Sequence, residues 1–232
     1  MFAKAIEDFA PTVTLFFLLA SADLLFMLIH AVHVWTPWLN AIHYSLEADR
    51  GLAENYQYIK MLWIVLCLLV VYQQTRSWSL LGWALLFAFL LVDDTAEIHE
   101  RAGHWFAARF EFPSLGGLRP NDFGELLFAA IVGKSLVVLT LLSFLRGNRS
   151  VRHFSRDLFC LIAVLAFFGV VVDLLHVISY FKLQVISDFL ALVEDGGEML
   201  MISLITVYIF DVVVSGGNVR IDVWGKVIRV RN

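Results

Sequence analysis

The sequence predicts an all-α, polytopic integral membrane protein, a helical bundle with about six transmembrane helices. Of its 232 residues, 60% are hydrophobic and only 16% are charged, whereas soluble domains are about half apolar and about a quarter charged. The apolar residues come in long uncharged runs, and each run extends to about 20 residues, which is roughly what a helix needs to cross the hydrocarbon. The runs are 11–22, 61–72, 77–92, 135–145, 158–172 and 199–210.

The pattern excludes a membrane β-barrel, because barrel strands alternate polar and apolar residues over segments of about ten. Residues 84–91 are apolar without interruption.

Pro37 ends the first helix, and residues 112–121 form a loop in which Asn121 or Asp122 can cap the fourth helix. We therefore expect helices at 11–36, 56–74, 77–107, 122–145, 157–181 and 185–211.

These helices make residues 1–217 one transmembrane domain, followed by a short cytoplasmic tail at 218–232. The tail alternates apolar and polar residues, which suits a short amphipathic strand or hairpin. With the N-terminus inside, ten lysines and arginines fall on the cytoplasmic side and six, Lys60 among them, on the outer side. Because basic residues concentrate in cytoplasmic loops, both termini are expected in the cytoplasm.

Composition also excludes some functions. The formal net charge of -4 leaves no basic face for nucleic acid. Cys67 and Cys160 lie inside apolar runs, where buried thiols act as small hydrophobes. Histidine-box desaturases and hydroxylases need more histidines than the seven present here, and no HExxH or HxxxH motif occurs.

Carboxylates and histidines concentrate on the expected outer side, and the third helix is the centre of this set. At about 100° per residue, Asp93, Glu97, Glu100 and His104 share one face of that helix. Asp94 flanks this stripe, and His99 points elsewhere. Like charges spaced in this way repel, so they require arginine partners, shared protons or a bound cation.

Other helices supply matching groups. Asp173 and His176 are three residues apart on the fifth helix, and Glu194 and Glu198 are four apart on the sixth, so each pair shares a face. The first helix carries Asp23, His30 and His33 on one broad stripe, and Lys134 is expected to neutralise Asp23. Gly196 and Gly197 permit either a close approach of two helices or a broken helix.

Carboxylates and imidazoles that converge in a bundle interior are the ligands of di-iron and di-manganese sites, so we expect a divalent metal ion, with iron, manganese and zinc not distinguished. The predicted catalytic groups are Asp93, Asp94 and His99. The predicted ligands are Glu97, Glu100, His104, Asp173, His176, Glu194, Glu198 and His30.

Three functions fit this pattern. The first is a metal-dependent membrane enzyme, a hydrolase or an oxidoreductase, acting on a lipid-soluble small molecule from the surrounding membrane lipid. The second is a cation- or proton-coupled transporter or channel. The third is a non-catalytic subunit that pairs with a partner protein or with other copies of itself. A transporter should continue its polar path through the inner halves of the helices, but these halves are almost purely apolar. A site on one side of the membrane, and therefore the enzyme, is favoured.

Overall fold

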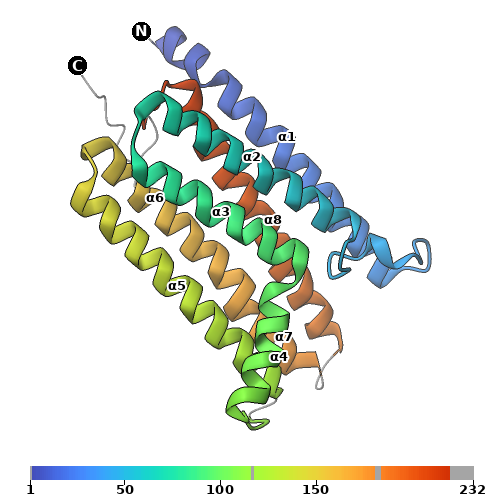
Figure 1. Cartoon of the computed structure of the whole chain (residues 1–232). Helices are drawn as coiled ribbons and strands as arrows, with labels where there is room; N and C mark the ends of the chain where they lie inside the picture. Colours follow the sequence, from blue (N-terminus) through green and yellow to red (C-terminus); the bar gives the residue numbers. More distant parts are fainter. Residues whose placement is uncertain (1, 116–117, 181–183, 220–232) are drawn as a thin grey trace.

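The protein is an all-α bundle in the computed structural model, which describes residues 2–115, 118–180 and 184–219 (Figure 1). In chain order its elements are α1 (Phe2–Trp35), the 3₁₀ turn η1 (Ile42–Tyr44), α2 (Leu52–Thr75), α3 (Trp78–Ala96), α4 (Ile98–Phe110), α5 (Pro120–Arg146), α6 (Arg149–Ala166), the π-helical segment η2 (Phe167–Val172), α7 (Asp173–Tyr180) and α8 (Gln184–Val214). The described residues contain no strand beyond an isolated bridge between Leu115 and Leu118, which confirms the predicted fold class.

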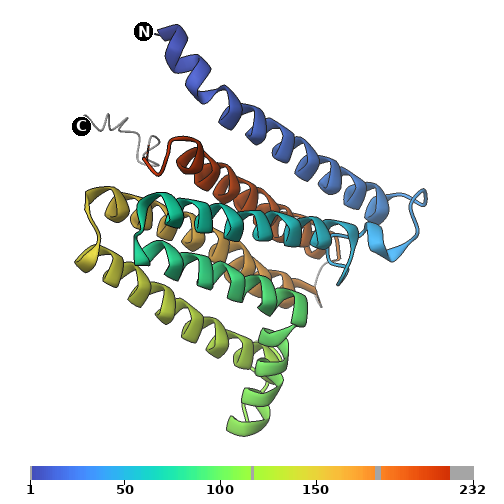
Figure 2. The same cartoon turned by 45° about the horizontal axis from the view of Figure 1, so that its top comes forward.

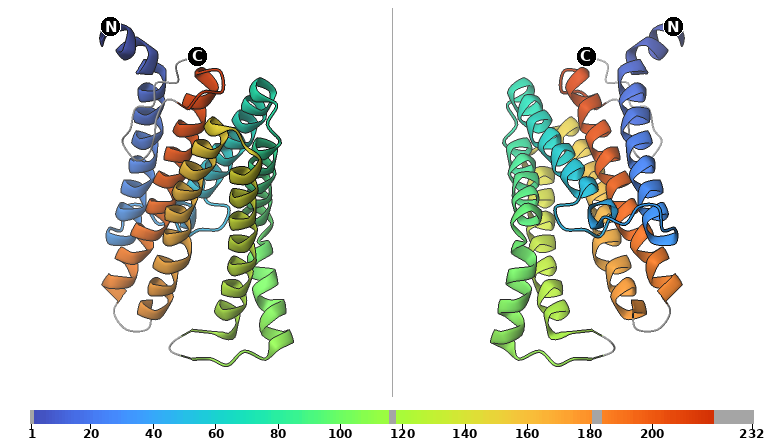
Figure 3. Two further views of the ribbon diagram at one scale, coloured as in Figure 1. Left: turned by 90° about the vertical axis from the view of Figure 1, so that its left-hand side faces the viewer. Right: turned by 90° about the vertical axis from the view of Figure 1, so that its right-hand side faces the viewer.

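Six segments are long and apolar enough to cross a membrane: Pro11–Trp35, Leu52–Thr75, Trp78–Ala96, Pro120–Ser143, Arg149–Ile178 and Val185–Val214. The chain is therefore a multi-pass membrane protein. Because the number of spans is even, the start of α1 and the end of α8 lie at the same end of the bundle (Figure 3). We call this the basic end, and we call the opposite end, where α1 stops and α2 starts, the acidic end.

Helix α8 is the centre of the bundle. In its apolar segment 67% of the residues are buried, against 11–28% in the other five spans. It packs against α1, α2, α6, η2 and α7. The core contains large side chains such as Trp83, Phe87 and Phe154 around Ile205 and Ile209 of α8. Helix α1 lies along one side of the bundle (Figure 2) and packs mainly on α8.

The predicted continuous helix at 77–107 is wrong, because the chain breaks between α3 and α4. Glu97 adopts a left-handed conformation with φ of 54° and serves as the cap of both helices. The break is compensated locally, since the Asp93 carboxylate accepts the His99 backbone N–H at 2.8 Å, one of the donors left unpaired at a helix start. Helix α4 then turns away from α3 and packs on α5.

Helices α5 and α6 begin earlier than expected, each beside a capping residue. The predicted start at residue 157 is replaced by Arg149, because the Asn148 side chain caps α6 by accepting the Val151 N–H at 2.9 Å. Helix α5 starts at Pro120, and Asp122 accepts the Arg119 N–H at 2.7 Å, so Asp122 caps the helix from inside its first turn.

At Gly196 and Gly197 the structure shows a close approach of helices and no helix break. Helix α8 runs through both glycines without a break. An added Cβ at Gly196 would lie 2.6 Å from the Met27 methyl carbon, and one at Gly197 would lie 2.3 Å from the Phe168 ring. The expected amphipathic strand at 218–232 lies almost wholly outside the described residues.

The contact of α4 with α5 depends on a pair of glycines. An added Cβ at Gly124 would lie 2.1 Å from the backbone oxygen of Gly103, whereas one at Gly133 of the same helix would have no neighbour within 4 Å. We therefore expect Gly124→Ala to lower the free energy of unfolding by about 1–3 kcal/mol, since backbone cannot yield as a side chain can. Gly133→Ala is the matched control, which is expected to leave stability unchanged or slightly raised. Denaturant titration in detergent measures both, and equal effects would contradict the assigned packing.

Candidate functional site

Carboxylates from five parts of the chain gather at the acidic end. They come from the linker after η1, from α3, α5 and α7, and from α8. Their charges interact: Glu47 with His176 and Glu194, Asp173 with Glu194 and Glu125, and Glu198 with Asp195 and Asp94. We call this set the acidic cluster; its members are Glu47, Asp94, Glu125, Asp173, His176, Glu194, Asp195 and Glu198.

The acidic cluster contains a histidine–carboxylate pair between α7 and α8. The Nδ1 atom of His176 lies 2.9 Å from Oε2 of Glu194, and both side chains are mostly buried. A ring nitrogen facing a carboxylate at this distance carries a proton, so Glu194 fixes the orientation of the His176 ring. This carboxylate–histidine arrangement orients imidazoles that bind metals.

The π-helical segment η2 lies beside this pair and shapes the contact with α8. An added Cβ at Gly169 would lie 2.0 Å from Oε1 of Glu198, so the Glu198 carboxylate rests on bare backbone. Only glycine permits this approach. Short π segments inside membrane or soluble helices occur often at functional sites, and this one leads directly into Asp173 and His176.

Few cations balance the acidic cluster. Among the described residues no lysine or arginine forms an ion pair with Asp94, Asp173, Asp195 or Glu198. Arg119 is committed to Asp122 at 2.8 Å and acts on Asp173 only at longer range. Partial desolvation raises the pKa of Glu47, and the neighbouring charges of Glu194 and Asp188 add to this effect. The cluster therefore has a surplus of negative charge that favours the uptake of cations or protons.

The predicted acidic stripe on the third helix does not exist, because the break at Glu97 rotates α4 relative to α3. Glu97 instead pairs with Arg50 at 3.0 Å and with Arg101 at 3.9 Å. Glu100 interacts at longer range with Glu125, and His104 is exposed on α4. Of the predicted stripe and its flank, Asp94 is the residue that interacts with Glu198 and so belongs to the acidic cluster.

Asp93 and His99 form a second, smaller pair. In addition to accepting the His99 backbone N–H, the Asp93 carboxylate lies 3.5 Å from the ring nitrogen Nδ1 of His99. This hydrogen bond raises the pKa of His99. Two of the three predicted catalytic groups, Asp93 and His99, therefore lie together at the joint between α3 and α4.

His30 holds the linker that carries Glu47. It is 1% exposed, and its Nδ1 atom accepts the Leu46 backbone N–H at 3.0 Å. The proton is then on Nε2, which has no partner among the described residues. In this arrangement neither ring nitrogen presents a lone pair to a metal, so His30 supports the cluster and does not belong to its donor set.

The sequence reasoning missed a buried ion pair in the middle of the bundle. The Lys60 ammonium donates to Asp23 Oδ1 at 2.8 Å, to the Met199 carbonyl at 2.9 Å and to Ser203 Oγ at 3.1 Å. Ser203 in turn donates to the other Asp23 oxygen at 2.6 Å, and both charged side chains are 0% exposed. The predicted partner Lys134 is wrong, since it is exposed on α5, a helix that packs against α3, α4 and α6.

Polar groups also continue toward the basic end, where an almost purely apolar interior was expected. Asp211 of α8 accepts a hydrogen bond from Thr12 of α1 at 2.9 Å. Asp157 of α6 is fully buried, and it pairs with Arg156 at 2.7 Å and accepts from Tyr208 at 3.4 Å. The expectation of an apolar half was therefore wrong for the faces that meet α8.

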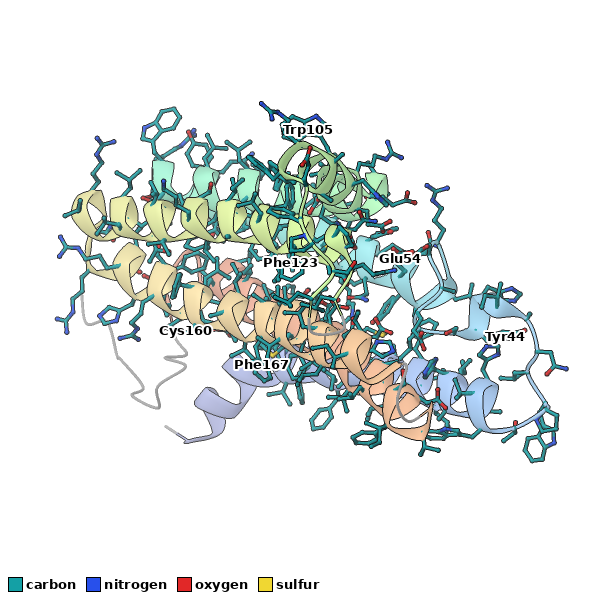
Figure 4. All side chains as sticks on the ribbon, turned by 90° about the horizontal axis from the view of Figure 1, so that it is seen from below. Tyr44, Glu54, Trp105, Phe123, Cys160 and Phe167 are labelled. Atoms are coloured by element: carbon teal, nitrogen blue, oxygen red, sulfur yellow. The ribbon has the colours of Figure 1, made fainter. Side chains whose placement is uncertain are left out.

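The described residues contain no ready-made group of three or more histidine, cysteine, aspartate or glutamate side chains arranged to hold a metal ion. The aromatic side chains of Trp105 and Phe167 are exposed on the outside of the bundle (Figure 4).

Together these features define a class: a six-span helical membrane protein with an acidic cluster at one end and a buried ion pair at mid-depth. The chain belongs to the family described as a domain of unknown function, DUF8692, whose model matches residues 12–212. Comparison with curated proteins and with solved structures gave no match.

The buried pair predicts a strong asymmetry between single and double substitutions. Lys60→Met leaves the Asp23 carboxylate buried without its cation, so we expect a loss of about 3–5 kcal/mol in the free energy of unfolding. Asp23→Asn combined with Lys60→Met removes both charges and should recover most of that loss.

Lys134→Met is the control, because it removes an exposed lysine from a neighbouring span. Thermal and denaturant unfolding in detergent would measure all three proteins. A double variant no more stable than Lys60→Met would contradict a coupled pair.

Proposed function

We propose that the chain is a metal-dependent membrane enzyme that acts on a lipid-soluble substrate at the acidic cluster. The observation that carries this proposal is the surplus of carboxylates around the His176–Glu194 pair: within the part of the chain that the structure describes, Asp173 and Glu198 have no lysine or arginine partner. Like charges held together in a partly desolvated site are unstable unless a cation or shared protons compensate them.

The donor types fit a divalent metal ion. Carboxylate and imidazole ligands together suit iron, manganese and zinc. Asp173, His176 and Glu198 are the residues that would hold the ion, with Asp195 as a neighbour and Glu194 orienting the His176 ring. Because the described residues hold no three donors already arranged for coordination, we expect metal binding to draw these side chains together and to stiffen the contact between α7 and α8.

A bound metal of this kind activates water or oxygen. The chain itself supplies the surroundings of that reaction. Glu194 fixes the His176 ring, and Gly169 gives the Glu198 carboxylate room to lie against η2. Asp93 and His99, with Asp94 beside them, are positioned at the edge of the cluster as the groups that accept and donate protons.

The same proposal includes the orientation of the chain. Arg76, Arg146, Arg149 and Arg152 lie at the basic end, and basic residues favour the cytoplasmic side of a membrane. The acidic cluster then opens to the extracytoplasmic side, with both termini in the cytoplasm.

Elemental analysis of purified protein tests the proposal. We expect wild type to contain a stoichiometric transition metal and His176→Ala to lose at least nine tenths of it. His153→Ala, a histidine of α6 at the basic end, is the matched control that should keep the metal. A chelator should lower the melting temperature of wild type and of His153→Ala, but not of His176→Ala, because a ligand that binds only the folded state stabilises it. Wild-type protein without metal, even after reconstitution with iron, manganese or zinc, would refute the proposal.

A second candidate function, proton- or cation-coupled transport, is favoured by the polar groups that continue along α8. Glu198 is five residues from Ser203, and Ser203 is eight residues from Asp211, so the steps are roughly 7 Å and 12 Å along the helix. Asp23 and Lys60 lie at the middle step. Ionisable groups at such depth are typical of proton relays.

Transport has its own test. Proteoliposomes that contain a pH-sensitive dye should acidify under an imposed potential if the chain conducts protons. The rate should fall at least tenfold in Asp23→Asn combined with Lys60→Met, while Lys134→Met should retain it. Rates equal to those of empty liposomes would exclude the second function and leave the first untouched.

A further inference from the structure

A groove between α2 and α3 opens on the surface of the bundle near the acidic end. It has a volume of about 660 Å³ and is lined by Asn55, Tyr58, Ile59, Leu62, Leu91, Val92, Thr95 and Ala96. Ile59, Leu62 and Val92 are 46–54% exposed, although they lie within membrane-spanning segments. Membrane lipid is therefore the medium that fills this groove.

Polarity changes with depth along the groove. Its polar residues, Asn55, Tyr58 and Thr95, lie on the turns of α2 and α3 nearest the acidic end. Its deeper part consists of Ile59, Leu62, Leu91 and Val92. From Asn55 to Leu62 the groove follows α2 for roughly 10 Å. An apolar channel with one polar mouth matches a lipid of the leaflet at the acidic end, with its head at the mouth and one chain inside.

The rim of the groove is rich in hydrogen-bond acceptors. The charge of Glu54 acts on both the Tyr58 hydroxyl and Asp94, so Glu54 lies close to the mouth of the groove (Figure 4 labels Glu54). The Asn55 amide nitrogen donates to the carbonyls of Arg50 and Gly51, which leaves its own oxygen as an acceptor. Arg50 is already paired with Glu97. This rim favours a head group that donates hydrogen bonds and carries a positive charge.

The rim also touches the acidic cluster. Asp94 interacts with Glu54 at the groove and with Glu198 inside the bundle. A lipid head group seated at Asn55 and Tyr58 would therefore lie next to the proposed reaction site without leaving the membrane.

We propose that this groove binds one hydrocarbon chain of a glycerophospholipid whose head group ends in a primary ammonium, and that this lipid is the substrate class of the acidic cluster. The substrate assignment rests on the proposed function, whereas the binding itself does not.

Photo-crosslinking in nanodiscs tests the binding. The discs contain phosphatidylethanolamine and phosphatidylglycerol in equal amounts, with a trace of either lipid bearing a diazirine in its acyl chain. With labelled phosphatidylethanolamine we expect Ile59, Leu62, Leu91 and Val92 to be modified at least fivefold more than Val137 and Leu141, which are lipid-exposed on α5. Labelling of the groove equal to that of α5 would overturn the proposal, as would a preference for phosphatidylglycerol.

A filling variant gives the matched comparison. Leu62→Trp places a large side chain in the groove, and Val137→Trp makes the same change at an exposed position of α5. We expect modification of Leu91 and Val92 to drop at least fivefold in the first variant and to stay unchanged in the second. Unchanged labelling in a folded Leu62→Trp protein would contradict occupancy of the groove.

Metal content, measured on the same samples, separates this inference from the proposed function. If wild-type protein holds its metal but the groove residues are not selectively labelled, the lipid-binding proposal is refuted and the metal-dependent enzyme is not. Selective labelling in wild-type protein without metal refutes the metal-dependent enzyme and leaves a lipid-binding site.

Discussion

The Lys60 ammonium holds together the three helices on which the rest of the structure depends. It extends from α2 to Asp23 of α1 and to Met199 and Ser203 of α8, and both charged side chains are fully buried. A charge in that position costs several kcal/mol unless every hydrogen bond is made, so the pair admits few relative placements of the helices. Once α1 is set against α8, His30 lies where its ring can hold the Leu46 backbone, and the linker delivers Glu47 to the acidic cluster.

Where η2 meets α8, the site depends on glycines, which have no side chain to keep the two helices apart. Gly169 admits the Glu198 carboxylate, and Gly197 admits the Phe168 ring, so η2 and α8 approach more closely than two ordinary helices. The π-helical segment accommodates this approach while shifting the register of the residues that follow it. Asp173 and His176 then face Glu194, and the His176–Glu194 pair forms at 2.9 Å. The site is therefore a product of backbone contact as much as of the acids themselves.

Membrane helices, their number and the gathering of acids at one end were predictable, because apolar runs and the position of charges are properties of the sequence alone. The partner of Asp23 was not. The sequence places Lys60 near the outer end of a helix expected to start at residue 56, which favours Lys134 as the partner. Helix α2 in fact starts at Leu52, so Lys60 lies about 12 Å inside its helix, and Lys134 lies about 21 Å inside α5. The partner of Asp23 was decided by which helices are neighbours: α1 and α2 both pack on α8, whereas α5 packs on α3, α4 and α6. The periodicity of the sequence does not reveal which helices are neighbours. The break at Glu97 was equally hidden, since residues 93–104 have no glycine or proline before Gly103 and fit an uninterrupted helix.

The break at Glu97 has a consequence for charge as well as for shape. A continuous helix would have kept Glu97 and Glu100 beside Asp93, adding to the repulsion. The left-handed residue costs roughly 1 kcal/mol, yet it turns Glu97 toward Arg50 and Arg101 and leaves Asp93 to His99. These acids are thereby neutralised by the chain, whereas Asp94, Asp173, Asp195 and Glu198 are not paired in this way among the described residues. The distinction between carboxylates that have a partner and those that have none among the described residues locates the part of the acidic end where the proposed cation or proton would bind.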